Sequence, residues 1–217
     1  YLYIIISIFL IKAGNSYSQD SLWIPYTNNP ENTEIQEIAD NVHDYGWVDL
    51  KAEKQINPLT IFNEYNIAFG LGEYDEMNLM RSDTDRIGYI HYRYRQYYKA
   101  IKVEGAEYIV HAREGISITA NGKIAENLTI DIAPSITESE ALDFAKNAVN
   151  ASQYMWEADS TYSLPKGELM IICNSYKNDF KAENFCLVYK FSIISKEPFD
   201  ANYVYINAHD GTILSKD

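Results

Sequence analysis

The sequence predicts an α+β protein made of two small domains, each with a helix packed on an antiparallel sheet. Two observations lead to this fold class. Strand-like segments, in which polar and apolar residues alternate, fill much of the chain between residues 88 and 214. A helical pattern precedes the strands in each half, once after residue 57 and again after residue 137. The chain has 217 residues, of which 47% are hydrophobic, and this is enough for a real core.

The first eleven residues are almost wholly apolar, and Lys12 and small polar residues follow them. The run is too short to span a bilayer comfortably, and Ser16-Tyr17-Ser18 has the small-x-small pattern of a cleavage site. Residues 1–18 are therefore expected to be a signal peptide of a secreted protein, with a buried helix as the alternative. The polar residues 19–45 are expected to form a lead-in with a short helix near residues 33–42.

Residues 46–133 are expected to form the first domain. Asn57-Pro58 can open a helix, because proline is favoured in a first turn, and Gly70 can end it. The residues that recur at helical spacing are Leu59, Phe62, Tyr65 (or Asn66) and Phe69. A short strand is expected over residues 77–80.

Further strands are expected over residues 88–98 and 107–112. The segment from Ile116 to Ala120 leads into Asn121-Gly122, a preferred two-residue hairpin turn, after which the chain is expected to return through residues 123–127. Residues 128–133 alternate between apolar and polar types, which is typical of a half-buried strand.

Residues 134–217 are expected to form the second domain. Thr137-Glu-Ser-Glu140 is a capping box, which predicts the start of a helix of about 12 residues. The strands expected after it cover residues 168–173, 185–195, 202–206 and 213–214.

Cys173 and Cys186 fall in two of these expected strands. Export would make a disulfide between them possible, and two buried thiols are an equal alternative. The chain has too little sulfur and histidine for a structural zinc site. Its formal net charge of −13 should repel nucleic acid and anionic membranes, so neither is expected as a partner, and the surplus is typical of a soluble surface.

No catalytic set can be assembled from the sequence. None of the 4 histidines lies in a His-Glu-x-x-His motif, which places two imidazoles on zinc and a carboxylate beside its water. The sequence also has no Gly-x-Ser-x-Gly elbow and no phosphate-binding glycine loop. The chain is therefore predicted not to be an enzyme, with no catalytic, cofactor-binding or metal-binding residue and no cofactor.

His91, Arg93 and Arg95 share one face of a regular strand, with tyrosines on the other face. An arginine two residues from a histidine repels a cation, so hydrogen bonds to neighbouring strands and to carboxylates such as Glu107 are favoured over metal binding. The tyrosines are expected to pack with wet hydroxyl groups, and a sugar-binding stripe is the alternative.

The stretch from Gly88 to His111 reads G-x-x-H-x-R-Y-x-Q-x-Y-x-x-I-x-V-x-G-A-E-Y-I-V-H. It resembles the FTP domain, the propeptide domain of secreted thermolysin- and fungalysin-type metallopeptidases, and segments at residues 46–50, 68–72, 85–88 and 120–122 also fall in the family's order. The motif residues, which are expected to be structural, are Gly88, His91, Arg93, Tyr94, Gln96, Val103, Gly105, His111, Asn121 and Gly122.

The second domain resembles the PepSY domain at Ile136–Leu142 and at Tyr203–Leu214. FTP followed by PepSY is the propeptide layout of thermolysin-like precursors, and together they would cover residues 46–215. Three positions depart from the pattern, since Arg95 stands where glutamine is common, Ala100 where glycine is usual, and Asn207 where aspartate is usual.

The resemblance implies the propeptide of a secreted thermolysin-like zinc metallopeptidase, which would act as an intramolecular chaperone and as an inhibitor of a catalytic domain absent from this chain. That domain would be the partner, linked in cis in the zymogen. Zinc, with calcium as a further candidate, would belong to that domain, and the full precursor would be a zinc metalloendopeptidase. The alternative is a stand-alone exported protein-binding or protease-inhibitor module that acts in trans.

Overall fold

The computed structural model describes residues 31–43, 46–175 and 180–217. The predicted signal peptide and residues 19–30 of the predicted lead-in lie outside the described residues. Within the described part, no helix is both long and apolar enough to cross a bilayer. The α+β class is confirmed, whereas the division into domains at residues 46, 134 and 217 stays a prediction.

Most of the described chain is strand. The strands are β1 (Ala39–His43), β2 (Trp47–Leu50), β3 (Asp75–Thr84), β4 (Ile90–Tyr98), β5 (Ile101–Arg113), β6 (Ile116–Gly122), β7 (Gln153–Tyr154), β8 (Glu168–Cys173), β9 (Phe185–Glu197), β10 (Phe199–Asn207) and β11 (Ile213–Lys216). The helices are short except for one, and they are α1 (Thr33–Ile38), η3 (Ala52–Lys54), α2 (Ile61–Glu64), η4 (Ile67–Phe69), α3 (Glu138–Val149), α4 (Met155–Ala158) and η5 (Ala182–Asn184).

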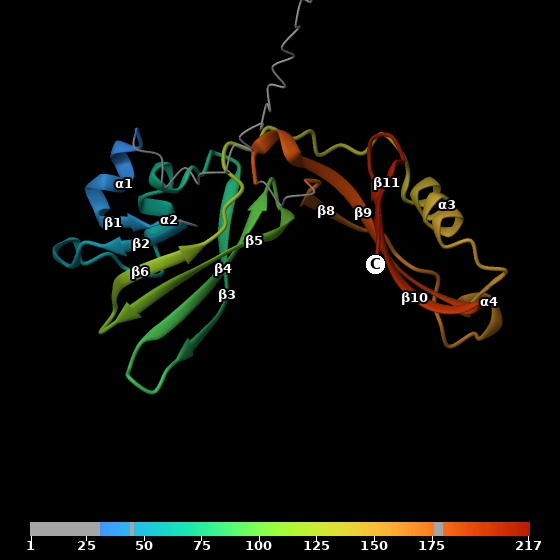
Figure 1. Cartoon of the computed structure of the whole chain (residues 1–217), viewed down its shortest axis with the longest axis horizontal. Coiled ribbons are helices and arrows are strands. Elements are labelled where there is room, and N and C mark those ends of the chain that lie inside the picture. Colours follow the sequence, from blue (N-terminus) through green and yellow to red (C-terminus); the bar gives the residue numbers. More distant parts are fainter. Residues whose placement is uncertain (1–30, 44–45, 176–179) are drawn as a thin grey trace, which may run out of the picture.

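One continuous sheet joins the two ends of the molecule. Its strand order is β1-β2-β6-β5-β8-β9-β10-β11. In addition, β4 pairs with β5, β3 pairs with β4, and β7 pairs with β9. The pairs are antiparallel except for β5 and β8, which run parallel and meet at Val103 and Ile171. From this junction the two parts diverge into the arch seen in Figure 1.

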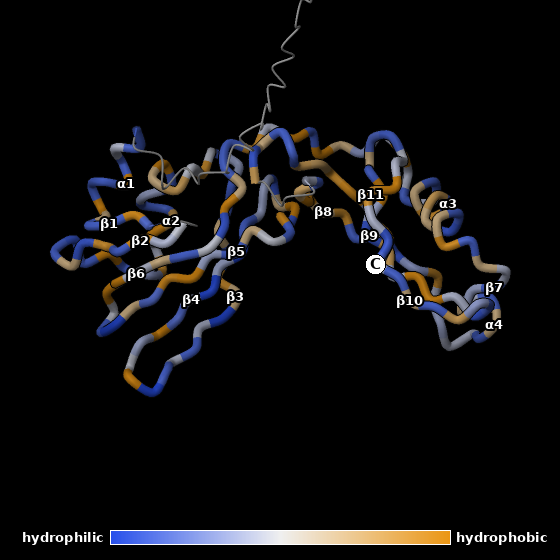
Figure 2. Tube along the Cα trace, in the orientation of Figure 1, coloured by the Kyte–Doolittle hydropathy of each residue, from blue (hydrophilic) through white to orange (hydrophobic). Residues whose placement is uncertain are grey.

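Two buried clusters stabilise the two parts of the sheet. In the first, α1, α2 and η4 contribute apolar side chains against β2, β4, β5 and β6, and the aromatic rings of Phe62, Phe69 and Tyr108 meet edge to face. In the second, Ala141, Leu142 and Ala145 of α3 pack with β8, β9 and β10. Along the strands hydrophobic residues alternate with hydrophilic ones (Figure 2), so each part buries one face of its sheet.

The long helix of the second part confirms its sequence signals. The Thr137 hydroxyl oxygen accepts a hydrogen bond from the backbone N–H of Glu140, and the Glu140 carboxylate accepts one from the backbone N–H of Thr137. The helix then runs for 12 residues and ends at Asn150, in the left-handed region with φ of +54°. The strand predicted over residues 168–173 is β8, and β9, β10 and β11 are each longer than predicted.

The first helix of the first part is shorter and more broken than the sequence predicts. Instead of one helix after Pro58, the chain forms α2, and then a separate 3-10 turn, η4, before Gly70 ends it with φ of +68°. Leu59 is 56% exposed and does not belong to the apolar face. The lead-in helix is also short, since α1 ends at Ile38 and the chain continues as β1.

The predicted hairpin turn at Asn121-Gly122 is wrong. Both residues lie inside β6, opposite Ile109 and Tyr108 of β5. The turn that joins these strands is at Glu114-Gly115, where both residues have positive φ (+54° and +81°), as a type I′ turn requires. The sequence signal failed because Asn-Gly is also compatible with an extended segment whose glycine meets a neighbouring backbone.

Two strand predictions in the first part also need correction. Residues 128–133 pair with no strand of the described chain; they connect the two parts, and Leu128, Ile130 and Ile132 pack on the second core from an irregular backbone. The short strand predicted at residues 77–80 is part of the much longer β3, because the whole segment from Asp75 to Thr84 pairs with β4.

The two cysteines lie on neighbouring strands but point to opposite faces. Cys173 is opposite Phe185, and Cys186 is opposite Ile172, so the register differs by one residue. The two thiols are not joined by a disulfide in this structure. Burial raises the pKa of the Cys186 thiol to about 11, which makes it a poor nucleophile.

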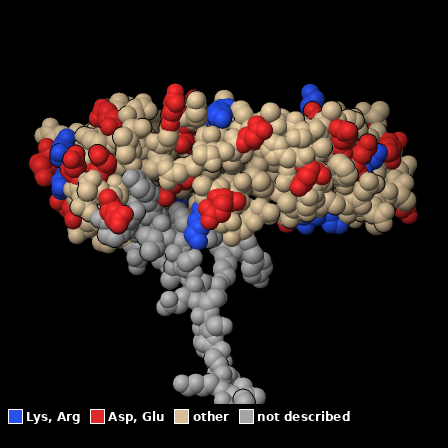
Figure 3. All heavy atoms as spheres, turned by 90° about the horizontal axis from the view of Figure 1, so that it is seen from above, with Lys and Arg blue, Asp and Glu red and all other residues tan. Residues whose placement is uncertain are grey.

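The acidic side chains are spread along the molecule rather than gathered in one patch on the face that Figure 3 shows. This distribution fits the interpretation that the net charge of −13 keeps the surface solvated.

Candidate functional site

A row of polar side chains crosses the first part of the sheet. Strand register places Asp49, Thr119, His111, His91 and Asp83 side by side, on β2, β6, β5, β4 and β3 in that order. Because neighbours along each strand turn toward the first core, this row lies on the opposite face of the sheet from α1, α2 and η4.

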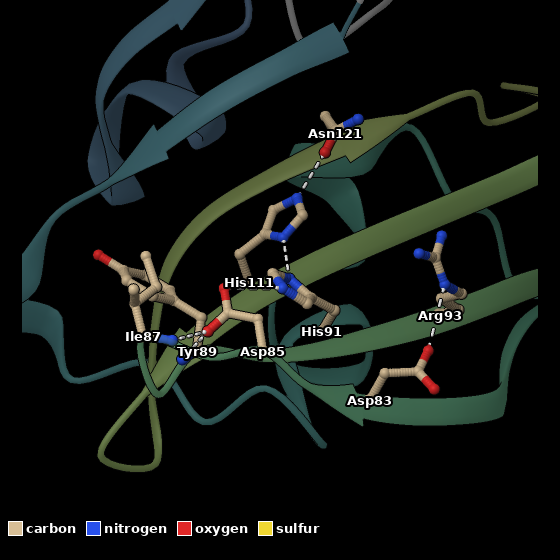
Figure 4. Close-up of polar contacts among 8 residues, drawn as sticks. All are labelled: Asp83, Asp85, Ile87, Tyr89, His91, Arg93, His111 and Asn121. Atoms are coloured by element: carbon tan, nitrogen blue, oxygen red, sulfur yellow. Dashed lines mark hydrogen bonds and ion pairs between the residues drawn. The ribbon is translucent and has the colours of Figure 1, made fainter.

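The turn between β3 and β4 is organised by Asp85. Its carboxylate accepts hydrogen bonds from the backbone N–H groups of Ile87 and Tyr89, each at 2.9 Å (Figure 4). Gly88 supplies the positive φ of +88° that this turn needs. Partial desolvation favours the protonated acid, but the two backbone N–H groups and His91 together lower the pKa of Asp85. The turn therefore presents a carboxylate to β4.

Two histidines meet at the centre of the row. The Nδ1 atoms of His91 and His111 are 2.6 Å apart, and the rings are nearly perpendicular (Figure 4). His91 Nε2 lies 3.3 Å from Asp85 Oδ2, and His111 Nε2 lies 2.7 Å from Asn121 Oδ1. Partial burial, and then the charges of His91 and Arg93, lower the pKa of His111. Trp47 stacks on the outer side of His111.

Three arginines line a groove beside this pair. Its volume is about 360 Å³, and its lining residues are Met80, Arg81, Arg93, Tyr94, Arg95 and Glu107. Arg95 contacts Glu107 Oε1 through both Nε and an Nη atom, at 3.1 and 2.6 Å, which confirms the predicted ion pair. Arg93 and Arg81 are held more loosely, each with Nε beyond 3.3 Å from Asp83 Oδ2.

Tyr94 and Gln96 point to the other side of β4, into the protein. The Tyr94 hydroxyl donates to the carbonyl oxygen of Pro58, and burial raises its pKa to about 12. The fully buried Gln96 amide donates to Asp75 Oδ1 and to the carbonyl oxygen of Ala125, and its own oxygen accepts from the Ala125 N–H. Gln96 thereby connects β4 to the start of β3 and to the segment that follows β6.

The remaining motif residues sit on β5 and β6. Val103 is fully buried where β5 meets β8, and Gly105, with φ of +75°, lies against Phe180. Gly122 has φ of +152°, and a Cβ added there would overlap Glu107 O and lie 2.6 Å from Tyr108 Cα. The two glycines, Gly105 and Gly122, allow neighbouring segments to approach the backbone closely.

Sequence reasoning placed His91, Arg93 and Arg95 on one face correctly, but it missed the residues that complete the site. Asp85 lies in the segment at residues 85–88 that follows the family's order, but no role at the site was predicted for it, although an aspartate shortly before a glycine is a turn signal. The contact of His111 with His91 and the stacking of Trp47 depend on strand register, for which the sequence carries no direct signal. Among the residues that the structure describes, no group of three or more His, Cys, Asp and Glu side chains could hold a metal ion.

A known protein-family motif matches the strands β3 to β6, which carry the histidine pair. Residues 75–124 match the Fungalysin/Thermolysin Propeptide Motif. The match runs from the start of β3 to just beyond β6, and so includes the histidine pair, Asp85 and the arginine groove.

Two proteins similar to this chain are Bacillolysin and the Thermostable neutral protease NprT. The chain is 27% identical over 146 residues to Bacillolysin of Bacillus amyloliquefaciens, which covers 65% of this chain and 27% of the relative. It is 28% identical over 147 residues to NprT of Geobacillus stearothermophilus, which covers 65% of this chain and 25% of the relative. The chain thus spans about a quarter of the length of these relatives.

Among solved structures, the Bacillus megaterium YpeB C-terminal domain aligns over 79% of this chain and 70% of its own, with 14% identity and a TM-score of 0.37. A likeness at this level carries no argument about fold or function. The motif match and the similarity to the neutral proteases together support a thermolysin-like propeptide region.

Proposed function

We propose that this chain is the propeptide region of a secreted thermolysin-like zinc metallopeptidase, and that it acts as an intramolecular chaperone and inhibitor of the catalytic domain. The observation that carries this proposal is the propeptide motif at residues 75–124. It is supported by similarity that covers about two thirds of this chain and only about a quarter of the neutral proteases. In this function the zinc, with calcium as a further candidate, belongs to the catalytic domain.

The finer organisation is part of the same proposal. Residues 1–18 would be the signal peptide, 19–45 the lead-in, 46–133 the FTP-like domain and 134–217 the PepSY-like domain. The ten motif residues would serve the fold rather than chemistry. Their contacts support this role, since Tyr94, Gln96 and Gly122 each join segments of the first part that are distant in the sequence.

Covalent linkage explains how such a region could inhibit without binding tightly. A partner in the same chain is present at an effective concentration that reaches the millimolar range for short flexible linkers. A modest intrinsic affinity is then enough to keep the catalytic domain occupied. Cleavage of the linker removes this advantage, so the released region would dissociate on dilution.

A refolding and inhibition experiment tests the proposal. The cognate catalytic domain, denatured and diluted with and without this chain, should recover more activity with the chain, and the mature enzyme should lose activity when the chain is added. The Gly122→Val variant, whose side chain cannot fit against β5, should neither aid refolding nor inhibit the mature enzyme. The Gly115→Ala variant, at an open turn, should have both effects. If the wild-type chain changes neither refolding nor activity, the proposal is wrong.

The coding sequence beyond Asp217 separates this function from the trans-acting alternative. A catalytic domain with a His-Glu-x-x-His helix in the same reading frame would support a propeptide. A stop codon would instead favour a stand-alone exported binding or inhibitor module.

A further inference from the structure

The contact between His91 and His111 is a hydrogen bond that depends on the number of protons the two rings hold. Their Nδ1 atoms are 2.6 Å apart, within hydrogen-bond distance. One Nδ1 must carry a proton and the other must present a lone pair, because two N–H groups, or two lone pairs, would repel each other at this distance.

The outer nitrogens determine the remaining protons. His91 Nε2 faces the Asp85 carboxylate, and His111 Nε2 faces the Asn121 side-chain oxygen; both of these oxygens are acceptors. Both Nε2 atoms therefore donate an N–H. With one further proton shared between the Nδ1 atoms, the pair holds three N–H protons on four nitrogens and carries one positive charge.

The surroundings place that charge on His91. Asp85 lies next to His91 from the β3–β4 turn, and Asp83 is opposite it on β3. His111 is farther from these carboxylates, is covered by Trp47 of β2, and faces Thr119 and Asn121 of β6, which do not titrate. In this arrangement His91 is the cation that donates through Nδ1, and His111 is the neutral acceptor.

Other charged groups near the row are already engaged. Arg93, on the same strand as His91, contacts Asp83, and Arg113, on the same strand as His111, lies over the Tyr89 ring. Asp49, on β2, contacts His43 at 2.7 Å. A second positive charge on the pair would thus meet Arg93 and the first imidazolium, and no further carboxylate among the described residues contacts His111.

We propose that the His91–His111 pair is an acid-sensitive latch between β4 and β5, closed when it holds three protons and opened when acidification adds a fourth. The fourth proton occupies the Nδ1 lone pair of His111, so the hydrogen bond is lost and two cations face each other. The inference concerns the folded chain itself and does not depend on the enzyme partner proposed above.

The direction of the pH effect follows from proton linkage. In the unfolded chain His111 titrates near the ordinary value of about 6.5. In the folded protein burial lowers the pKa of His111, so between the two values the unfolded chain binds more protons. The stability that comes from keeping His111 neutral is complete above a pH of about 6.5 and is lost as the pH falls through the lower, folded value.

Nuclear magnetic resonance of the whole chain with ¹⁵N-labelled histidine tests the proton count directly. At pH 7.5 we expect His111 to be neutral with its proton on Nε2, and His91 to be protonated on both nitrogens. On acidification His111 should gain its Nδ1 proton. A proton on His111 Nδ1 at pH 7.5, or two neutral rings, would overturn the proposal.

Urea unfolding between pH 7.5 and 5.5 tests the consequence for stability. One extra proton on the unfolded state lowers the folding equilibrium constant by up to about tenfold for each pH unit. The wild-type chain should therefore lose stability more steeply than His111→Gln by up to that factor. The control is His209→Gln, since His209 contacts Ser135 and Asp131 in the second part, and it should leave the wild-type slope unchanged.

Equal slopes for the wild-type chain and His111→Gln would contradict the latch. If His111→Gln does not fold, the resonance titration of the wild-type chain decides the matter alone.

Discussion

At the scale of single residues, the first part of the protein relies on positions where backbone segments touch. Gly122 lies where β6 passes the Glu107–Tyr108 backbone of β5, and no side chain fits there. Gln96 performs the same task with hydrogen bonds, since its buried amide satisfies both backbone groups of Ala125. Both positions lie within the family motif, so part of that motif coincides with close contacts between segments of this fold.

Substitution of Gly122 by alanine should destabilise the protein strongly. The added Cβ overlaps the carbonyl oxygen of Glu107 and lies 2.6 Å from Tyr108 Cα, so the strands must separate. We expect a loss of about 3 kcal/mol in the free energy of unfolding, measured with urea. The matched control is Gly115→Ala, which meets no atom within 4 Å and should cost about 1 kcal/mol for its positive φ. Equal losses would show that the close approach is unimportant.

Substitution of Gln96 by alanine should also be costly. It leaves the N–H and carbonyl of Ala125 and the Asp75 carboxylate without this partner, and it opens a cavity. We expect a loss of about 3 kcal/mol in chemical unfolding. Asn63→Ala, at an exposed position of α2, should change stability by less than about 0.5 kcal/mol. A small effect at residue 96 would mean that water replaces the amide there.

At the scale of elements, helices with local end signals are predicted well from the sequence, whereas segments shaped by tertiary packing are not. The helix α3 has its own start signal, because Thr137 and Glu140 satisfy each other's backbone groups whatever the rest of the chain does. The broken segment from α2 to η4 has apolar residues at helical spacing, yet the chain turns at Tyr65 and Asn66 to bring Phe69 into the first core. Packing there overrides the pattern.

The capping box of α3 should be worth about as much as an ordinary N-cap. Thr137→Ala removes the oxygen that accepts from the Glu140 N–H, and we expect the free energy of unfolding to fall by about 1 kcal/mol. Thr137→Ser keeps this oxygen and should recover most of the loss. If serine is as destabilising as alanine, the threonine methyl group rather than the cap is responsible.

At the scale of the whole molecule, β5 connects the two parts. Tyr108 and Val110, near its end, belong to the first core, whereas Val103 and Ala106, near its start, belong to the second. The parallel contact of β5 with β8 continues the sheet across the arch (Figure 1). A single strand that carries residues of both cores makes it difficult for one part to unfold while the other stays intact.

We therefore expect the described parts to unfold in one cooperative transition. Trp47 reports on the first part and Trp156 packs on the second core. The chain has a third tryptophan, Trp23, so W47F and W156F variants that also carry W23F isolate the two signals. Their fluorescence midpoints should coincide in urea. Val103→Ala, at the junction, should lower both midpoints together through a loss of about 2 kcal/mol. Two separate midpoints would show that the parts are independent.

The sequence by itself determined the α+β class, the helix α3, the strand β8 and the motif that points to a propeptide, because these depend on residue periodicity, caps and residue identity within a short window. It also placed His91 and Arg93 on one strand face.

Only the tertiary structure decided the strand register. It brought His91 onto His111, moved the hairpin turn from Asn121-Gly122 to Glu114-Gly115, and shared β5 between two cores. The physical reason is that register is set by the packing of side chains from strands far apart in the sequence, and a local pattern carries little information about such partners.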